Sequence, residues 1–215
     1  MMASVKKIVW YYDFISPYAY LASQALGRFP SDIKIEYRPI LFAGILKQWD
    51  TRGPGEIAPM RKFTYRQIAW LAQKNAIPLK FPPIHPFNPL KLLRLNIALG
   101  ARPDVTDRLF RFVWAEGKSS DDHNAWCELL SDLGLTPGQA ETLVSDPEVK
   151  AKLISETDSA LDKGIFGVPG FMVDGEVFWG FDSMPFIANF LQDPALFTQA
   201  TMQQADGVGE GITRK

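Results

Sequence analysis

Apolar and polar positions along the chain predict two β-containing ends around a helical middle. The run from residue 6 to 14 is apolar and β-rich, as in a central strand, and residues 33–38 alternate apolar and polar as in a half-buried strand. Apolar positions recur at helical spacing between 17 and 29, so we expect a helix there. A single crossover helix of this length predicts that the two strands are parallel.

From residue 59 to 164 the pattern is helical throughout. Thr136 and Asp146 each stand before a proline, which is typical of an N-cap followed by the first residue of a helix. The proline-rich segment 81–89 interrupts these helices, and it is apolar enough that we expect it to pack. The expected helices span 60–75, 89–99, 105–115, 120–133, 137–144 and 147–163.

β-type patterning returns after Gly164. Residues 170–173 and 176–179 predict two short strands. Asp174-Gly175 joins them and is a strong signal for a type I′ hairpin turn.

The two β-containing ends need each other, because neither alone buries a two-faced sheet. Joined, they predict an α/β thioredoxin-like domain made of residues 1–45 and 164–198, with a four-stranded mixed sheet and a last helix over 184–191. Residues 46–163 form an all-helical domain inserted in the middle. The tail 199–215 is polar and contains glycines, so we expect it to be disordered.

Composition narrows the possible functions. The net charge of −1 argues against a nucleic-acid or anionic-membrane partner. We find no secretory signal and no run of about 18 apolar residues, so we expect a cytoplasmic protein. Cys127 is the single cysteine, which excludes an intrachain disulfide, and the two histidines lack metal-ligand spacing, so no metal site is expected.

Ser16 and Pro17 stand where the first strand gives way to the first helix. Serine is a favoured N-cap, and proline suits the first helical position. Unpaired amides and the helix dipole favour an anion at such a place. The sequence therefore predicts an anion site at Ser16, with a plain helix cap as the alternative.

Three short motifs carry a resemblance to a known family. At residues 16–18, 168–169 and 180–183 (Ser-Pro-Tyr, Val-Pro and Gly-Phe-Asp-Ser) the chain resembles the 2-hydroxychromene-2-carboxylate isomerases and the related kappa-class glutathione transferases. The resemblance implies a DsbA/kappa-type thioredoxin fold with an inserted helical domain. Disulfide-exchanging members carry Cys-Pro-x-Cys where this chain has Ser-Pro-Tyr-Ala at 16–19, so disulfide exchange is excluded.

In the family, the serine hydroxyl hydrogen-bonds the sulfur of bound glutathione, and the resemblance implies that role for Ser16. A free thiol has a pKa of about 8.5, so only a small fraction is thiolate at neutral pH. A hydroxyl donor at a helix N-terminus favours the charged form and lowers that pKa. The enzyme then activates a borrowed thiol and needs no cysteine of its own.

The resemblance also implies a cis peptide bond between Val168 and Pro169, with the backbone of Val168 pairing with glutathione like an added strand. The alternative is an ordinary trans proline at the start of an edge strand. In the turn before the last helix, the family binds the γ-glutamyl ammonium on an acidic residue and the carboxylate on the helix start. Phe181, Asp182 and Ser183 match that turn, and a plain capping pair is the alternative.

Lys62 stands three residues before Tyr65, a spacing that the family shares. There the lysine reaches a glutathione carboxylate, as a point charge can. The alternative is a solvated helix face. Kappa enzymes have an asparagine where Gly53 aligns, so that contact is lost or replaced.

Substrate candidates lie between the expected domains, where ligand sites tend to occur. Phe42, Trp49 and Phe87 are candidates to line an aromatic-accepting cavity, and a core position is the alternative for each. Arg94 stands in a stretch like one in the isomerases and is a candidate to meet a substrate carboxylate, although a solvated face is its alternative. Asn88 in the proline-rich loop is a further candidate.

The resemblance implies a glutathione-dependent isomerase of aromatic catabolism. It would interconvert 2-hydroxychromene-2-carboxylate and trans-o-hydroxybenzylidenepyruvate, or a close aromatic analogue. The family mechanism adds glutathione thiolate to the substrate, opens its ring, allows rotation about a single bond and returns glutathione. Alternatives are a kappa-like transferase or peroxidase and a non-enzymatic glutathione-binding protein. The family also implies a homodimer.

Overall fold

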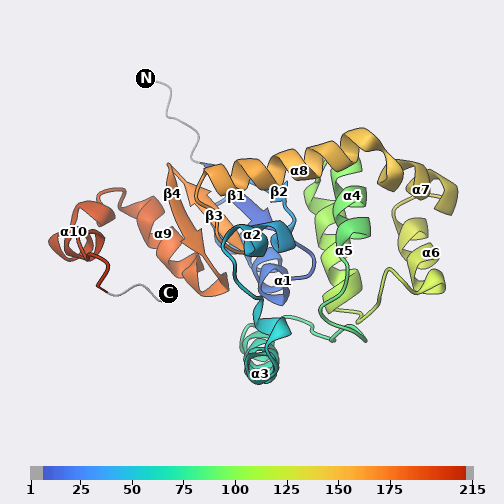
Figure 1. Cartoon of the computed structure of the whole chain (residues 1–215), viewed down its shortest axis with the longest axis horizontal. Coiled ribbons are helices and arrows are strands. Elements are labelled where there is room, and N and C mark those ends of the chain that lie inside the picture. Colours follow the sequence, from blue (N-terminus) through green and yellow to red (C-terminus); the bar gives the residue numbers. More distant parts are fainter. Residues whose placement is uncertain (1–6, 212–215) are drawn as a thin grey trace. The chain divides into compact units, whose positions relative to one another are not determined.

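The computed structural model describes residues 7–211. The chain forms two compact units, one ending at Phe181 and the other beginning at Asp182. The first unit holds the sheet and the helices that carry the candidate site (Figure 1). Among the described residues, no helix is both long and apolar enough to cross a membrane.

The four-stranded mixed sheet is the one that the sequence predicts. Its strands are β1 (Lys7–Tyr12), β2 (Lys34–Pro39), β3 (Gly170–Val173) and β4 (Glu176–Trp179), in the order β2-β1-β3-β4. β1 is parallel to β2 and antiparallel to β3, and β3 and β4 form the expected hairpin. Asp174 and Gly175 both have positive φ, as a type I′ turn requires.

Both faces of β1 are covered, which is why its sequence is a continuous apolar run rather than an alternating one. On one face, Tyr11 joins a buried cluster with Ile45 of α2 (Phe42–Gln48) and Ala160 of α8 (Pro147–Asp162). On the other, the rings of Trp10 and Tyr12 pack against Phe110 of α5 (Pro103–Trp114).

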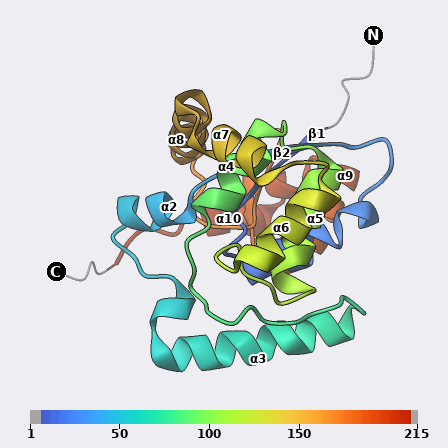
Figure 2. The same ribbon diagram turned by 90° about the vertical axis from the view of Figure 1, so that its right-hand side faces the viewer.

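The middle of the chain is helical, as expected, with boundaries within a few residues of those predicted. Besides α5 and α8 it holds α3 (Ala58–Lys74), α4 (Leu90–Ala98), α6 (His123–Asp132) and α7 (Pro137–Ser145). Thr136 and Asp146 cap α7 and α8 with their side chains. α3 is the least buried of the longer helices, with only Ile68 and Ala72 fully covered, and Figure 2 shows it along one side of the first unit.

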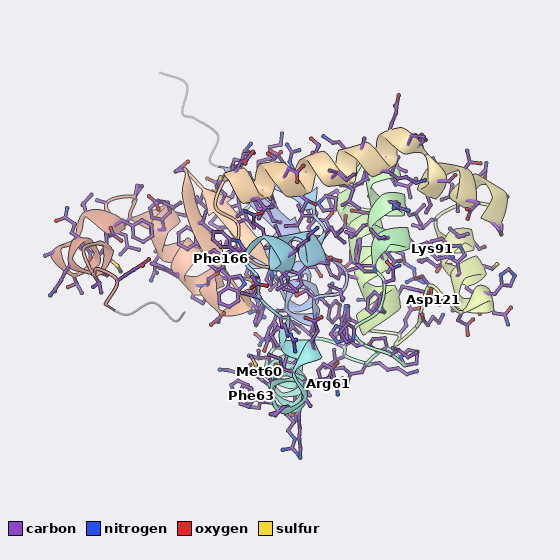
Figure 3. All side chains as sticks on the ribbon, viewed as in Figure 1. Met60, Arg61, Phe63, Lys91, Asp121 and Phe166 are labelled. Carbon is purple, nitrogen blue, oxygen red and sulfur yellow. The ribbon has the colours of Figure 1, made fainter. Side chains whose placement is uncertain are left out.

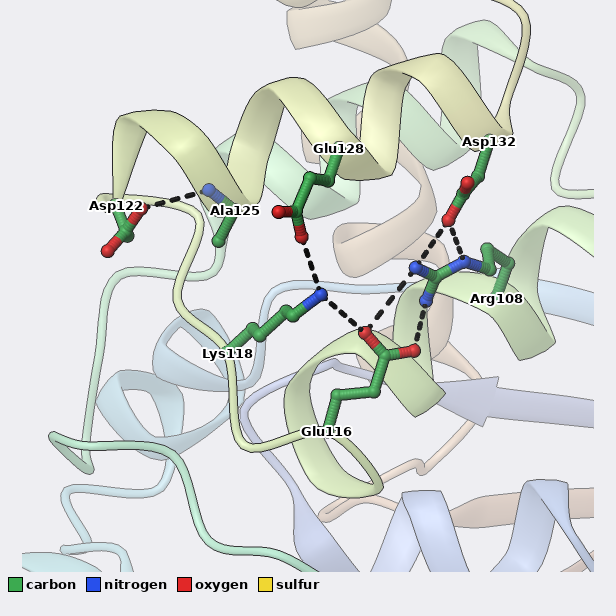
Figure 4. A network of polar contacts seen from close by, with 7 residues as sticks. All are labelled: Arg108, Glu116, Lys118, Asp122, Ala125, Glu128 and Asp132. Carbon is green, nitrogen blue, oxygen red and sulfur yellow. Dashed lines mark hydrogen bonds and ion pairs between the residues drawn. The ribbon is translucent and has the colours of Figure 1, made fainter.

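A network of ion pairs fastens α6 to the end of α5 (Figure 4). Arg108 contacts Glu116 at 2.8 Å and Asp132 at 2.7 Å, and Lys118 contacts Glu116 at 3.2 Å and Glu128 at 2.8 Å. Arg108, Glu116 and Lys118 each have two partners, so these groups form a connected network rather than isolated surface pairs, which by themselves contribute little to stability.

Three expectations differ from the structure. α1 spans Pro17–Ser23 and is followed by a 3-10 turn at Leu26–Arg28, so the helix expected over 17–29 ends early. α2 was not expected, and it spans the expected domain boundary between residues 45 and 46. The division into a thioredoxin-like part and an insertion stays a prediction.

The third difference concerns the tail that we expected to be disordered. In the second unit, α9 (Met184–Gln192) is followed by α10 (Ala200–Asp206), because Ala, Met and Gln in that stretch are good helix formers. The ring of Phe197 packs on Phe186 and Phe190 of α9. Residues 212–215 of the expected disordered tail lie outside the described residues.

Candidate functional site

Ser16 lies at the junction of β1 and α1, and its hydroxyl makes two hydrogen bonds. Its Oγ accepts from Ala19 N at 3.2 Å, which makes it the N-cap of α1, and donates to Val168 O at 3.2 Å. The cap that the sequence offered as an alternative is therefore present, together with a second contact 152 residues away along the chain. Ser16 is buried, so its hydroxyl proton has few partners to choose among.

The loop Asp13–Ser16 is held from several sides. The fully buried Asp13 carboxylate accepts from Ile15 N at 3.1 Å and from Phe42 N, at the start of α2, at 2.9 Å. Burial raises the pKa of Asp13 to about 7, although these amide hydrogen bonds lower it in part. The indole of Trp114 donates to Phe14 O at 2.8 Å. This loop is thus fixed before any ligand arrives.

His85 completes the support of the loop. Its Nε2 lies 2.8 Å from Ile15 O and its Nδ1 lies 2.6 Å from the hydroxyl of Tyr65 on α3. Burial lowers the pKa of His85, the Ile15 carbonyl raises it in part, and the charge of Arg61 lowers it further. The proline-rich loop packs, as expected, and it does so through a histidine that the sequence offered only as a poor metal ligand.

The segment facing Ser16 precedes β3. The Val168–Pro169 peptide bond is cis, as the resemblance implied, so the alternative of a trans proline is wrong. Pro169 O accepts from Gly180 N at 2.9 Å. An added Cβ at Gly167 would lie 2.4 Å from the indole nitrogen of Trp179, so a side chain there would require the indole to move.

Comparisons with known proteins agree with this geometry. Residues 7–192 match the family model of the DSBA-like thioredoxin domain. A 2-hydroxychromene-2-carboxylate isomerase of Sphingobium xenophagum is 30% identical over 195 residues, covering 87% of this chain and 99% of that protein. The chain belongs to the 2-hydroxychromene-2-carboxylate isomerase family.

A sequence relative and a solved structure extend this comparison. Glutathione S-transferase kappa 2 of Caenorhabditis elegans is 28% identical over 213 residues, covering 90% of this chain and 95% of that protein. A solved 2-hydroxychromene-2-carboxylate isomerase superimposes with a TM-score of 0.76 at 22% identity, covering 94% of this chain and all of that one, which supports the fold. Its relatives are thus named as an isomerase and a transferase, so the chain belongs to a family of enzymes.

Lys62, the cation predicted to bind glutathione, is preceded on α3 by a second cation, Arg61. Arg61 and Tyr65 are four residues apart and share a helix face, and the charge of Arg61 acts on both Tyr65 and His85. Arg61 and Lys62 are both exposed. The structure therefore places Arg61 on the side of the Ser16 loop, and the role of Lys62 toward glutathione stays a prediction.

Phe181, Asp182 and Ser183 form a 3-10 turn that leads into α9. Phe181 is buried and closes the first unit, whereas Asp182 is exposed and opens the second. The Ser183 side chain makes no capping hydrogen bond to α9, so the alternative of a capping pair does not hold for it. Their role in cofactor binding stays a prediction.

The four substrate candidates fall in different environments. Phe42 is half-buried and packs against the Tyr11 cluster, while Trp49 is 53% exposed. Asn88 Oδ1 accepts from Leu90 N, the first residue of α4, at 3.0 Å. Arg94 has a buried Nε with no hydrogen-bond partner among the described residues. Among the described residues no hydrogen bond or ring contact joins the four, and their role in substrate binding stays a prediction.

Sequence reasoning missed the residues that support the Ser16 loop. Asp13 carried a usable signal, because it is the only charge between Ile8 and Ser16. His85 and Trp114 carried none, since their partners Ile15 and Phe14 lie 70 and 100 residues away along the chain. The other histidine, His123, lies one turn before Cys127 on α6, with its Nε2 3.7 Å from Cys127 Sγ.

Proposed function

We propose that this protein is a glutathione-dependent isomerase that interconverts 2-hydroxychromene-2-carboxylate and trans-o-hydroxybenzylidenepyruvate, or a close aromatic analogue. One observation carries the proposal. The hydroxyl of Ser16 lies 3.2 Å from the carbonyl oxygen of Val168. The family resemblance assigns the first group to the sulfur of bound glutathione and the second to its backbone. The family membership and the isomerase named among its relatives support the same reaction.

The residues present suit a bound thiol. Ser16 Oγ keeps Ala19 N as its donor and has one proton to give, which goes to Val168 O. Turning that proton toward sulfur leaves the helix cap intact and frees Val168 O to accept a ligand amide. When bound, glutathione supplies the nucleophile and is recovered unchanged. Arg61 and Lys62 are the cations of α3 proposed to hold one of its carboxylates.

The defining assay follows the absorbance of a hydroxychromene carboxylate with the protein, with and without glutathione. We expect equilibration with the benzylidenepyruvate only when glutathione is present. If no glutathione-dependent change occurs, the isomerase proposal fails. Conjugation of glutathione to a nitroarene would instead favour the transferase that the kappa relative suggests, and glutathione binding in calorimetry with neither activity would leave a binding protein.

Replacing Ser16 tests its role directly. Ser16→Ala removes the only hydroxyl proposed to meet the sulfur, so we expect the pKa of the bound thiol to rise and turnover to fall by about 100-fold, the usual loss when one stabilising donor is removed. The ultraviolet absorbance of the thiolate, measured against pH, reports the first quantity.

Two further variants separate this role from helix capping. Ser16→Gly also lacks the hydroxyl but costs a helix cap only a few tenths of a kcal/mol, so it should match Ser16→Ala in thiol pKa. Ser23→Ala removes a hydroxyl at the other end of α1, where it donates to Tyr20 O at 2.7 Å, and should leave the titration unchanged. An unaltered thiol pKa in both Ser16 variants would refute the role.

We also propose that the protein is cytoplasmic and, as the family resemblance implied, a homodimer. α3 supports an interface, because its Met60, Phe63 and Trp70 are 45%, 65% and 55% exposed. Figure 3 shows Met60 and Phe63 on the same side of the helix. Large apolar side chains gathered on one helix are typical of surfaces that bind a partner. Light scattering at micromolar concentration measures the mass directly, and a monomer would end this part of the proposal.

A further inference from the structure

His85 joins three segments that are distant in sequence. Its ring stands between Tyr65 of α3 and the carbonyl of Ile15, the residue before Ser16. A carbonyl oxygen only accepts, so Nε2 carries a proton and donates to Ile15 O. Burial lowers the pKa of His85 and favours the neutral ring, in which Nδ1 accepts from the Tyr65 hydroxyl. Both hydrogen bonds therefore specify one tautomer.

The ring is also enclosed, so it has little freedom to turn. The ring of Trp114 lies 5.3 Å away and that of Phe87 6.0 Å away, measured between centroids. On another side, Gly55 approaches so closely that an added Cβ would lie 3.3 Å from His85 Cε1. A histidine that contacts two aromatic rings and is bonded at both nitrogens defines the position of its Nε2 proton well.

We propose that His85 is a positioning residue for Ser16: its Nε2–H fixes the Ile15 carbonyl, and with it the peptide that leads into Ser16, so that Oγ is directed at the ligand sulfur. This inference rests on the proposed role of Ser16 toward a thiol. The preceding carbonyl, Phe14 O, is already held by Trp114. Without His85, the peptide next to Ser16 loses the one side chain that fixes its oxygen.

The same contact links α3 to the loop. Tyr65 selects the His85 tautomer, and Arg61 stands on the same face of α3 one turn earlier. A carboxylate that binds Arg61 or Lys62 therefore engages the helix that fixes His85. A carboxylate bound there is in this way connected, through Tyr65 and His85, to the peptide that leads into Ser16.

A matched pair of variants tests the position of the proton. The amide nitrogen of His85→Gln falls near the place of Nε2 and still donates to Ile15 O, whereas the shorter His85→Asn reaches only the place of Nδ1. We expect His85→Asn to lower kcat by about 10- to 100-fold, as small misplacements of a reacting group do. It should also raise the pKa of the bound thiol, with KM for glutathione within about threefold of the original. His85→Gln should restore most of both.

The outcomes separate this inference from the function it rests on. If the unmodified protein shows no bound thiolate, the proposed function fails. If it does, and the Gln and Asn variants are equally active or equally impaired, positioning through Nε2 is wrong and His85 serves packing alone. If thermal unfolding shows that His85→Asn does not fold, Tyr65→Phe replaces it as the test. This variant keeps the ring contact with Phe81 and loses only the hydroxyl. An unchanged thiol pKa and kcat in Tyr65→Phe would then overturn the proposal.

Discussion

At the scale of single residues, the most unusual feature of the molecule is a buried carboxyl beside its candidate site. Asp13 accepts two backbone amides and has no cationic partner among its hydrogen bonds in the described structure. Burial outweighs those bonds and raises its pKa to about 7. Near neutral pH a single carboxyl thus changes charge within the loop that presents Ser16.

This pKa predicts how stability depends on pH. Between the ordinary pKa of about 4 and the raised value, the folded state binds a proton that the unfolded state has lost, so the free energy of unfolding falls as pH rises across that window. The slope approaches about 1.4 kcal/mol per pH unit. Asp13→Asn should remove it, which urea unfolding of both proteins from pH 4 to 8 would show. A constant difference between them would mean that Asp13 ionises at its ordinary pKa.

At the scale of elements, the sequence predicted those helices, strands and turns that are determined by residues close together along the chain. The hairpin at 170–179 and the capped helices α7 and α8 follow from turn and cap residues that act within a few positions. α2 escaped prediction because its start is held by Asp13, 29 residues earlier, rather than by a cap of its own. For the same reason, Ser16 and Val168 were found through family motifs while their supporting residues His85 and Trp114 were not.

A buried polar triad attaches the helical middle to the sheet. The Tyr12 hydroxyl of β1 donates to Asn96 Oδ1 of α4 at 2.7 Å, and Asn96 Nδ2 donates to Thr106 Oγ1 of α5 at 2.9 Å. Burial raises the pKa of Tyr12 well above its ordinary value, so the hydroxyl stays a donor. The stretch around Arg94 that resembles the isomerases thus contributes through Asn96, as a structural residue.

Asn96→Ala should therefore destabilise the fold more than an ordinary polar truncation. It removes the amide that bonds both hydroxyls and leaves Tyr12 and Thr106 with their direct contact at 3.2 Å, at a cost of about 2–4 kcal/mol in the free energy of unfolding. Chemical denaturation measures this, with Asn124→Ala on the exposed side of α6 as a control expected within about 0.5 kcal/mol of the original. A loss no larger than that of the control would show that the triad does not hold α4 and α5 to the sheet.

At the scale of the whole molecule, the candidate site exists only once distant parts of the chain have met. β1 lies between β2, which follows it closely, and β3, which lies beyond the helical middle. The same pairing brings Val168 to Ser16. A ligand that needs both residues binds the folded chain and not the unfolded one, so it stabilises folding by mass action, by about 2.7 kcal/mol at 100 times its Kd.

The pH dependence of that stabilisation tests the thiolate itself. If Ser16 lowers the thiol pKa, bound glutathione has lost a proton that free glutathione still holds between the two pKa values. Affinity then rises with pH, by up to about tenfold per unit, and levels off above about 8.5, the pKa of the free thiol. S-methylglutathione has no thiol to ionise and is therefore the control ligand. The pH dependence of its effect on the melting temperature reports the titration of all other groups, including Asp13. We expect the difference between the two ligands to grow from pH 6 to 8.5 in the original protein and to stay constant in Ser16→Ala. A difference that is flat in both would mean that the ligand binds as a thiol and that Ser16 does no more than cap α1.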